Sequence, residues 1–203
     1  MSGLSEEFEF ELPNRGDDRP GLDDLDDPVG DFDSDEDDLD DFPEDANEED
    51  IDLVVALYRE DGQPVVTPLD LDLANDLDGL ITQLRRIPGD GGALGFVSIA
   101  AEFFVIVRVR GKHVQVFLSD VVAAGDWPIA RDAVDFLGVD VPDEEDEAAP
   151  VGDLEILSDA GLRDFELESI ASEYDEDSTT LLERIAKKIK FGPQFAKAVA
   201  TFE

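Results

Sequence analysis

The segment LGFVSIAAEFFVIVRVRGKHVQVFLSD (residues 94–120) decides the fold. It contains three runs rich in β-branched and aromatic residues, LGFVSIA (94–100), EFFVIVRVRG (102–111) and KHVQVFLSD (112–120). Such runs favour β-strands, and strands joined by short turns pair in the antiparallel sense. The segment therefore predicts an antiparallel meander at the centre of a sheet.

The middle run indicates what each face of that sheet contacts, because successive side chains of a strand point to opposite faces. One face carries only apolar residues: Phe103, Val105, Val107 and Val109. The other face carries Phe104, Ile106, Arg108 and Arg110. We expect a helix to cover the apolar face, and we expect the charged end of the other face to meet solvent.

Two further strands and a helix are predicted before the meander. IDLVVALYRE (51–60) and QPVVTPLD (63–70) flank Asp61-Gly62, which is a hairpin signal. The prolines of the second run place it at a sheet edge. Apolar residues then recur with helical spacing: Leu73, Leu77, Leu80, Ile81, Leu84 and Ile87. A helix is predicted over 73–87, with Asp70 or Asp72 as its cap and Pro88-Gly89 as its stop.

After the meander, the sequence predicts helices. Pro128 and Gly138 suit the two ends of a helix over 128–137. DVPDEEDEAAP (140–150) reads as an acidic linker, and three helical patterns follow it within 151–203. We predict an α+β fold, with an antiparallel sheet of about five strands and packed helices in 51–139. The C-terminal helical region is expected to pack on the same domain.

Charge sets the class of partner. Acids outnumber bases by 54 to 15, which gives a net charge of −39, and residues 1–50 alone hold 23 acids with only Arg15 and Arg19. A segment so charged buries too little apolar surface to fold, so we expect 1–50 to be a disordered acidic tail. The whole chain should be soluble and cytoplasmic, should repel nucleic acids and anionic membranes, and should attract basic proteins or cations.

Residues 31–45, DFDSDEDDLDDFPED, invite comparison with a calcium-binding loop. In the best frame, Asp33, Asp35, Asp37, Asp41 and Glu44 fall at ligand positions. Asp38, however, stands where the sharp turn of such a loop needs glycine, and Pro43 precedes the last ligand. The specific site is therefore rejected in favour of a solvated tail.

No other motif identifies an active site. The absence of cysteine excludes disulfides, thiolate zinc sites and cysteine nucleophiles. The lone His113 has no inferable catalytic partner and is expected to face solvent on its strand. GDGG (89–92) lacks the Lys-Ser/Thr of a phosphate loop, so a flexible helix-to-strand connection is expected. We predict no catalytic residue, no metal and no cofactor.

Two groups of bases stand out because bases are rare in this chain. Arg108, Arg110, Lys112 and His113 surround one turn. A second group near the C-terminus consists of Arg184, Lys187, Lys188, Lys190 and Lys197. Bases at the C-terminal end of a helix are favourable in any helix. The functional alternatives are a surface for a protein partner or a dock for the acidic tail.

Three segments stand out together: VFLSDVVAA (116–124), VGDLEILSDAGL (151–162) and LLERIAKKIKFGPQFAKAV (181–199). With them, the chain resembles the actinobacterial tRNA adenosine deaminase-associated proteins over roughly residues 52–200. The resemblance implies an accessory role beside tRNA-specific adenosine deaminase, and it carries over no catalytic residue. The chain lacks the His/Cys zinc signature of such deaminases.

Three hypotheses follow. The first is a non-catalytic binding protein that contacts the deaminase or another basic protein, without binding nucleic acid directly. The second is an acidic tail that mimics nucleic acid and competes for a tRNA-binding surface. The third, a metal-assisted hydrolase, rests only on the abundance of carboxylates.

Overall fold

The computed structural model describes residues 42–89, 91–142 and 147–202, all within one compact unit, residues 37–203. Six strands form a single antiparallel sheet in the order β2-β1-β3-β4-β5-β6. Their bounds are β1 Ile51–Glu60, β2 Gln63–Pro68, β3 Ala93–Ile99, β4 Phe103–Arg110, β5 His113–Leu118 and β6 Val151–Gly152. The predicted α+β class and the five predicted strands are confirmed; β6 is an additional short strand at the edge beside β5.

The pairing register fixes which residues share an end of the sheet. Tyr58 of β1 pairs with Ala93 of β3, which also pairs with Val109 of β4, and Val109 pairs with Val114 of β5. The turns after β1 and β4 therefore lie at one end of the sheet, which we call the hairpin end. The turn between β3 and β4 lies at the opposite end.

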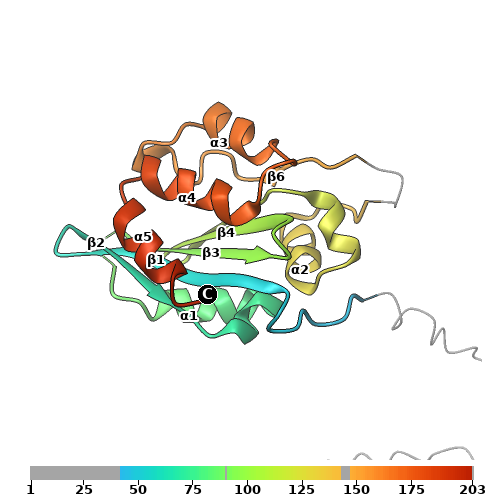
Figure 1. The fold of residues 1–203 in the computed structure, drawn as a ribbon, viewed down its shortest axis with the longest axis horizontal. Helices are drawn as coiled ribbons and strands as arrows, with labels where there is room; N and C mark the ends of the chain where they lie inside the picture. The colour runs from blue at the N-terminus through green and yellow to red at the C-terminus, as the bar shows by residue number, and fades with distance from the viewer. Residues whose placement is uncertain (1–41, 90, 143–146, 203) are drawn as a thin grey trace, which may run out of the picture. The chain divides into compact units, whose positions relative to one another are not determined.

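Helices cover the apolar face of the meander, as predicted. Helix α1 (Leu77–Arg85) and helix α2 (Pro128–Leu137) lie on this face (Figure 1). They pack their apolar sides against Val105 and Val107 of β4 in one continuous core. Pro128 takes the predicted first position of α2, and Gly138, with a φ of 67°, is its predicted C-terminal cap.

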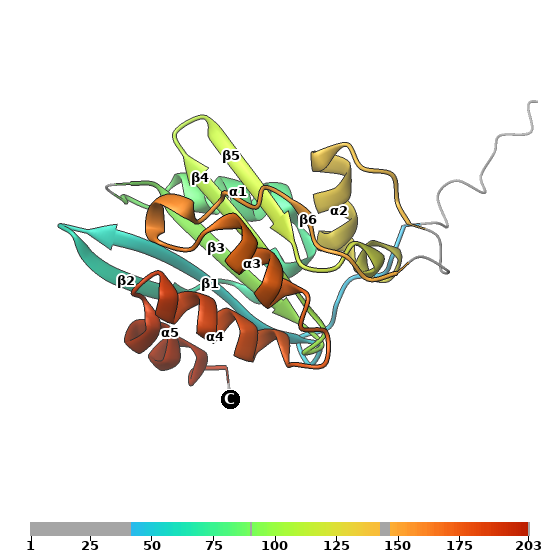
Figure 2. The same ribbon diagram turned by 90° about the horizontal axis from the view of Figure 1, so that it is seen from above.

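The other face of the sheet is also covered. At its charged end Arg110 meets solvent as expected, whereas Arg108 is buried, which corrects the expectation for that residue. The cover consists of α3 (Asp164–Ala171), α4 (Ser178–Lys188) and α5 (Gly192–Val199) (Figure 2). They form a second core with Phe96, Phe104 and Ile106, all of which are fully buried. The sequence alone did not predict the burial of Arg108, because its partner Asp159 lies 51 residues later in the chain.

The helix predicted over 73–87 is interrupted. A short 3₁₀ helix, Leu71–Asn75, precedes α1. Between them Asp76 adopts an extended φ of −142°, and its carboxylate accepts a hydrogen bond from the Gly79 N–H at 2.8 Å. Asp76 is therefore the cap of α1, in place of the predicted Asp70 or Asp72.

Part of the predicted acidic tail lies on the folded unit. Ala46 is buried, and its N–H and C=O both bond to the side-chain amide of Asn75, at 2.8 and 3.0 Å. The segment from residue 42 to residue 50 is thus anchored before β1 begins. Residues 1–41, with most of the calcium-loop frame, lie outside the described residues. No helix within the described ranges is long and apolar enough to cross a membrane.

Candidate partner-binding surfaces

The first predicted group of bases is divided between the interior and the surface. Arg108 is only 8 % exposed, and it donates hydrogen bonds to the Ile156 carbonyl at 2.6 Å and to both carboxylate oxygens of Asp159. Arg110 reaches the same carboxylate at 3.1 Å. The hydrogen bond from Arg108 holds the pKa of Asp159 below its usual value, against the opposing effect of burial. Arg108 is therefore a buried ion-pair residue and not part of a surface, whereas Lys112 and His113 are exposed as expected.

The second predicted group mostly joins α3 to α4. Arg184 makes two hydrogen bonds to Glu173, at 2.6 and 2.8 Å, and Lys188 contacts Glu166 at 2.8 Å. These contacts lower the pKa values of Glu173 and Glu166 and raise that of Arg184. Lys187 pairs with Glu183 one turn earlier. Lys190, and Lys197 of α5, are exposed and form no ion pair within the described part of the chain.

The fold brings three members of each group to the same end of the sheet. Helix α4 starts beside β3, where the Ser178 and Ser98 hydroxyls lie 2.7 Å apart, and it runs toward the hairpin end. There the Arg59 guanidinium donates to the Ile189 carbonyl at 3.3 Å. Sequence reasoning missed Arg59, Arg85 and Arg86, each of which stands just before a turn at this end. We call the following residues the basic end: Arg59, Arg85, Arg86, Arg108, Arg110, Lys112, Lys187, Lys188 and Lys190.

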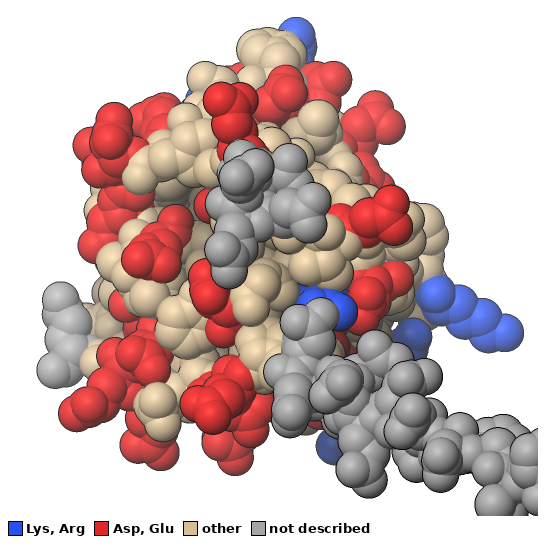
Figure 3. Space-filling view, turned by 90° about the vertical axis from the view of Figure 1, so that its right-hand side faces the viewer, with Lys and Arg blue, Asp and Glu red and all other residues tan. Residues whose placement is uncertain are grey.

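The opposite side of the unit is dominated by carboxylates. Figure 3 looks onto the end that carries α2, and Asp and Glu side chains cover much of that view (Figure 3). Acidic residues occupy the β3–β4 turn at Glu102 and the α3–α4 connection at Asp175, Glu176 and Asp177. Charge is therefore distributed unevenly along the strands: carboxylates dominate one end, and bases outnumber carboxylates at the other, where Glu60 and Asp61 lie at the β1–β2 turn.

A pocket of about 410 Å³ lies between the start of α1 and the middle of α2, and its lining is acidic. We call it the acidic pocket; it is lined by Asp76, Leu77, Asp78, Asp132, Asp135 and Phe136. The Asp132 carboxylate accepts a hydrogen bond from the Leu77 N–H at 3.2 Å. Burial raises the pKa of Asp132 above its usual value, and the charges of Asp76, Asp78 and Asp135 add to the effect while the Leu77 bond opposes it. Phe136 is 48 % exposed beside these carboxylates.

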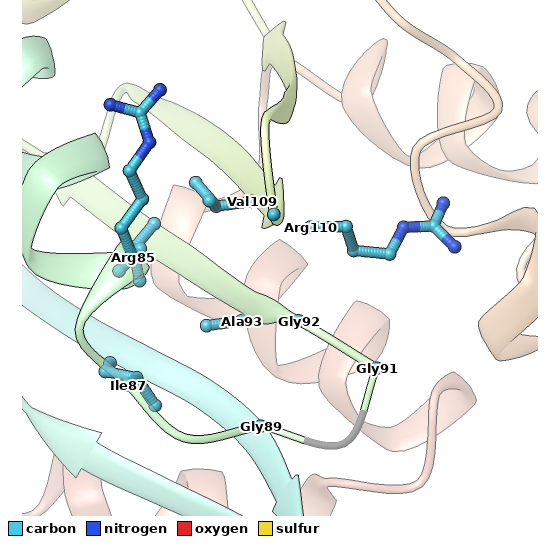
Figure 4. A pocket seen from close by; sticks show the side chains of 10 residues that line it. Arg85, Ile87, Gly89, Gly91, Gly92, Ala93, Val109 and Arg110 are labelled. Carbon is cyan, nitrogen blue, oxygen red and sulfur yellow. The ribbon is translucent and has the colours of Figure 1, made fainter.

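A second pocket, of about 470 Å³, lies at the basic end beside the glycine-rich loop. Arg85 and Arg110 contribute to its wall, and their guanidinium groups point in different directions instead of converging (Figure 4). The loop connects α1 to β3, as predicted, and Asp90 within it lies outside the described residues. This arrangement gives no support to a phosphate loop.

The described residues give no support to the hypothesis of a metal-assisted hydrolase. Among them, no three His, Cys, Asp or Glu side chains gather in a way that could hold a metal ion. Asp52, Ser98 and Ser178 form a hydrogen-bonded chain that sequence reasoning missed, with distances of 2.9 and 2.7 Å. Both serines are fully buried, so the chain links α4 to the sheet and leaves no hydroxyl open to a substrate.

Comparison with known proteins agrees with the resemblance seen in the sequence. Residues 52–192, from β1 to the first residue of α5, match the model of the family described as Rv3753c-like tRNA adenosine deaminase-associated protein. Protein Rv3753c of Mycobacterium tuberculosis is 34 % identical over 148 residues, which cover 71 % of this chain and 86 % of that protein. No solved structure matches. The chain therefore belongs to the Rv3753c-like tRNA adenosine deaminase-associated protein family.

Proposed function

We propose that this chain is a non-catalytic accessory protein that binds a basic protein partner through the acidic pocket, and that this partner is tRNA-specific adenosine deaminase. The observation that carries the proposal is the gathering of four carboxylates around an exposed phenylalanine on a fold that belongs to this family. The family description supports the choice of partner.

The pocket is suited to cationic side chains for an electrostatic reason. Asp76, Asp78, Asp132 and Asp135 repel one another, and the repulsion contributes to the raised pKa of Asp132. A lysine or arginine of a partner would relieve this repulsion on binding, so the interaction is stronger than one with an isolated carboxylate. Phe136 and its neighbour Val139, both exposed, supply the apolar contact that anchors many protein interfaces.

The test is a calorimetric titration of the purified deaminase with the full chain and with two triple variants. The pocket variant carries Asp78→Asn, Asp135→Asn and Phe136→Ser, which spares the hydrogen bonds of Asp76 and Asp132. The matched control carries Asp164→Asn, Phe165→Ser and Glu168→Gln on α3, where all three side chains are exposed.

We expect the full chain and the control to bind alike, and the pocket variant to bind at least about tenfold more weakly, or about 1.4 kcal/mol. No complex at tens of micromolar in low salt would reject the partner. Equal losses in both variants would reject the pocket.

A further deletion separates this proposal from the alternative of nucleic-acid mimicry. Residues 1–41 contain 18 acids and two bases. If this segment imitates RNA and competes for a tRNA-binding surface, then its removal should abolish most of the affinity and flatten the salt dependence. Under the pocket proposal, a chain that begins at residue 42 retains the affinity of the full chain.

A further inference from the structure

The basic end is unexpected in so acidic a chain. Nine of the thirteen Lys and Arg residues between 42 and 202 belong to it, of which Arg108 is buried and the other eight are partly or fully exposed. They come from β1, α1, β4, the β4–β5 turn and the end of α4, so no stretch of sequence contains them all. Only the antiparallel arrangement, which returns each element to the same end, gathers them.

Some of these bases are held by carboxylates, and others are not. Arg108 and Arg110 share Asp159, and Lys187 and Lys188 pair with Glu183 and Glu166. By contrast, four members are exposed and make no ion pair to any described residue: Arg85, Arg86, Lys112 and Lys190.

We propose that the basic end binds the phosphate backbone of a folded RNA. The ends of β1, β3, β4 and β5 lie side by side, and at about 4.8 Å between strands they span about 15 Å, with α1 and α4 on either side. A broad row of separated cations suits a backbone of repeated phosphates better than one small anion, and the divergent arginines of the adjoining pocket agree with this. Gly111, exposed at the tip of the β4–β5 turn, allows close approach.

The net charge of −39 predicts that the chain as a whole repels RNA. The uneven distribution of charge makes this repulsion weaker at the basic end. Seven residues of β3 extend about 23 Å at about 3.3 Å per residue. Charges in solution are screened within about 8 Å at physiological salt. A phosphate at the basic end therefore experiences the nearby bases much more than the carboxylates at the far end. The nearby carboxylates are fewer than the bases: Glu60 and Asp61 lie at the β1–β2 turn, and Asp159 is paired with Arg108 and Arg110.

The experiment measures the fluorescence anisotropy of a labelled, unmodified tRNA transcript titrated with the full chain at several salt concentrations. The test variant carries Arg85→Gln, Arg86→Gln, Lys112→Gln and Lys190→Gln. Its control carries Lys197→Gln, Ser169→Glu, Thr180→Glu and Ala196→Glu, all at exposed positions of α3, α4 and α5. Both variants change the net charge by the same four units, and circular dichroism checks the fold of each.

We expect the control to bind within about threefold of the original chain and the test variant to bind at least about tenfold more weakly at low salt. Its logarithmic salt dependence should be less steep by up to about 3, at about 0.7 for each phosphate that the variant no longer neutralises. Equal binding by both variants, or no binding by the original chain at about 50 µM in low salt, would overturn the proposal. Preferential competition by polyglutamate over RNA would overturn it too, since the occupant would then be an acidic protein. The deaminase is absent from this assay, so its outcome is separate from that of the proposed function.

Discussion

At the scale of single residues, the turn between β3 and β4 is strained. Ala100 and Ala101 have φ values of 54° and 57°, a left-handed conformation that glycine or asparagine adopts at lower cost. Three contacts hold the turn: the Ala100 N–H bonds to the Asp50 carbonyl, the Ala101 N–H to the Asp52 carboxylate, and the Ala101 carbonyl to the Ser178 N–H, at 2.7, 2.8 and 3.1 Å. The start of β1 and the start of α4 are thereby tied to one turn.

Replacing Ala101 by glycine should stabilise the protein. The left-handed conformation costs an alanine about 1–2 kcal/mol, part of which is offset by the greater freedom of glycine in the unfolded chain. We expect the free energy of unfolding in urea to rise by about 0.5–1 kcal/mol. The control variant, Ala196→Gly at an exposed site within α5, should lower the free energy of unfolding by about 1 kcal/mol. A loss of stability in both variants would refute the assignment of strain to the turn.

The strand position of Arg108 could be predicted from the sequence, but its burial could not. Its position on β4 follows from the alternation of the strand, and the sequence correctly places it on the face opposite to Val107 and Val109. Its burial depends on Asp159, fifty-one positions later, and on the C-terminal helices above it. Neither the spacing nor the composition of the sequence carries that contact, so Arg108 was counted among surface bases.

At the scale of elements, α1 and α2 meet through a carboxylate. Asp132 of α2 accepts a hydrogen bond from the first residue of α1, where an acceptor is favourable because the first N–H groups of a helix lack partners. The same carboxylate is partly buried among other acids, which raises its pKa. When Asp132 is ionised, this hydrogen bond therefore stabilises the junction of α1 and α2 less than the same bond to an uncharged acceptor would.

Asp132→Asn should raise stability at neutral pH. Because the pKa of Asp132 is higher in the folded chain than its usual 3.8, ionisation costs stability above that folded pKa, and acidification restores it. Asparagine keeps an acceptor for the Leu77 N–H without charge. The urea midpoint of the variant should exceed that of the original chain at pH 7, and the difference should shrink as the pH falls toward 3.8. A difference that stays constant with pH would contradict the raised pKa.

Most elements were predictable from local pattern. The run 51–60 coincides with β1, whose end is marked by the turn at Asp61-Gly62. The run 128–137 coincides with α2, whose ends are marked by Pro128 and Gly138. The break before α1 was missed, since Leu73 and Leu77 continue the helical spacing across Asp76 and only the geometry of the cap reveals the interruption. Strand β6 was missed because two residues, Val151 and Gly152, give no periodicity.

At the scale of the whole molecule, helices on both faces make the sheet a middle layer (Figures 1 and 2). The central strand β3 is buried along its entire length. Sequence reasoning expected the charged end of one face to meet solvent, although it also expected the C-terminal helices to pack on the domain. The sequence predicted two separate groups of bases. Members of both groups lie near Arg59, Arg85 and Arg86 because the antiparallel strands and the helices that connect them end at the same side of the sheet.

The excess of acids should make stability depend on salt. Crowded carboxylates repel one another in the folded chain and less so in the expanded unfolded chain, and added salt screens that repulsion. Raising sodium chloride from about 20 mM to about 500 mM should therefore raise the melting temperature, as measured by circular dichroism. Potassium chloride should act alike. A melting temperature that falls with salt would indicate that the ion pairs outweigh the repulsion.

Separated charge along the strands also makes the folded unit an electric dipole. In the field of a charged partner such a molecule rotates before it touches, so that carboxylates turn toward a cationic protein and bases toward an anionic polymer. Orientation during approach raises the rate of productive encounters, and the gain falls steeply with ionic strength. The arrangement of turns at one end of an antiparallel sheet would thus govern how quickly this protein finds its partners, in addition to how tightly it binds them.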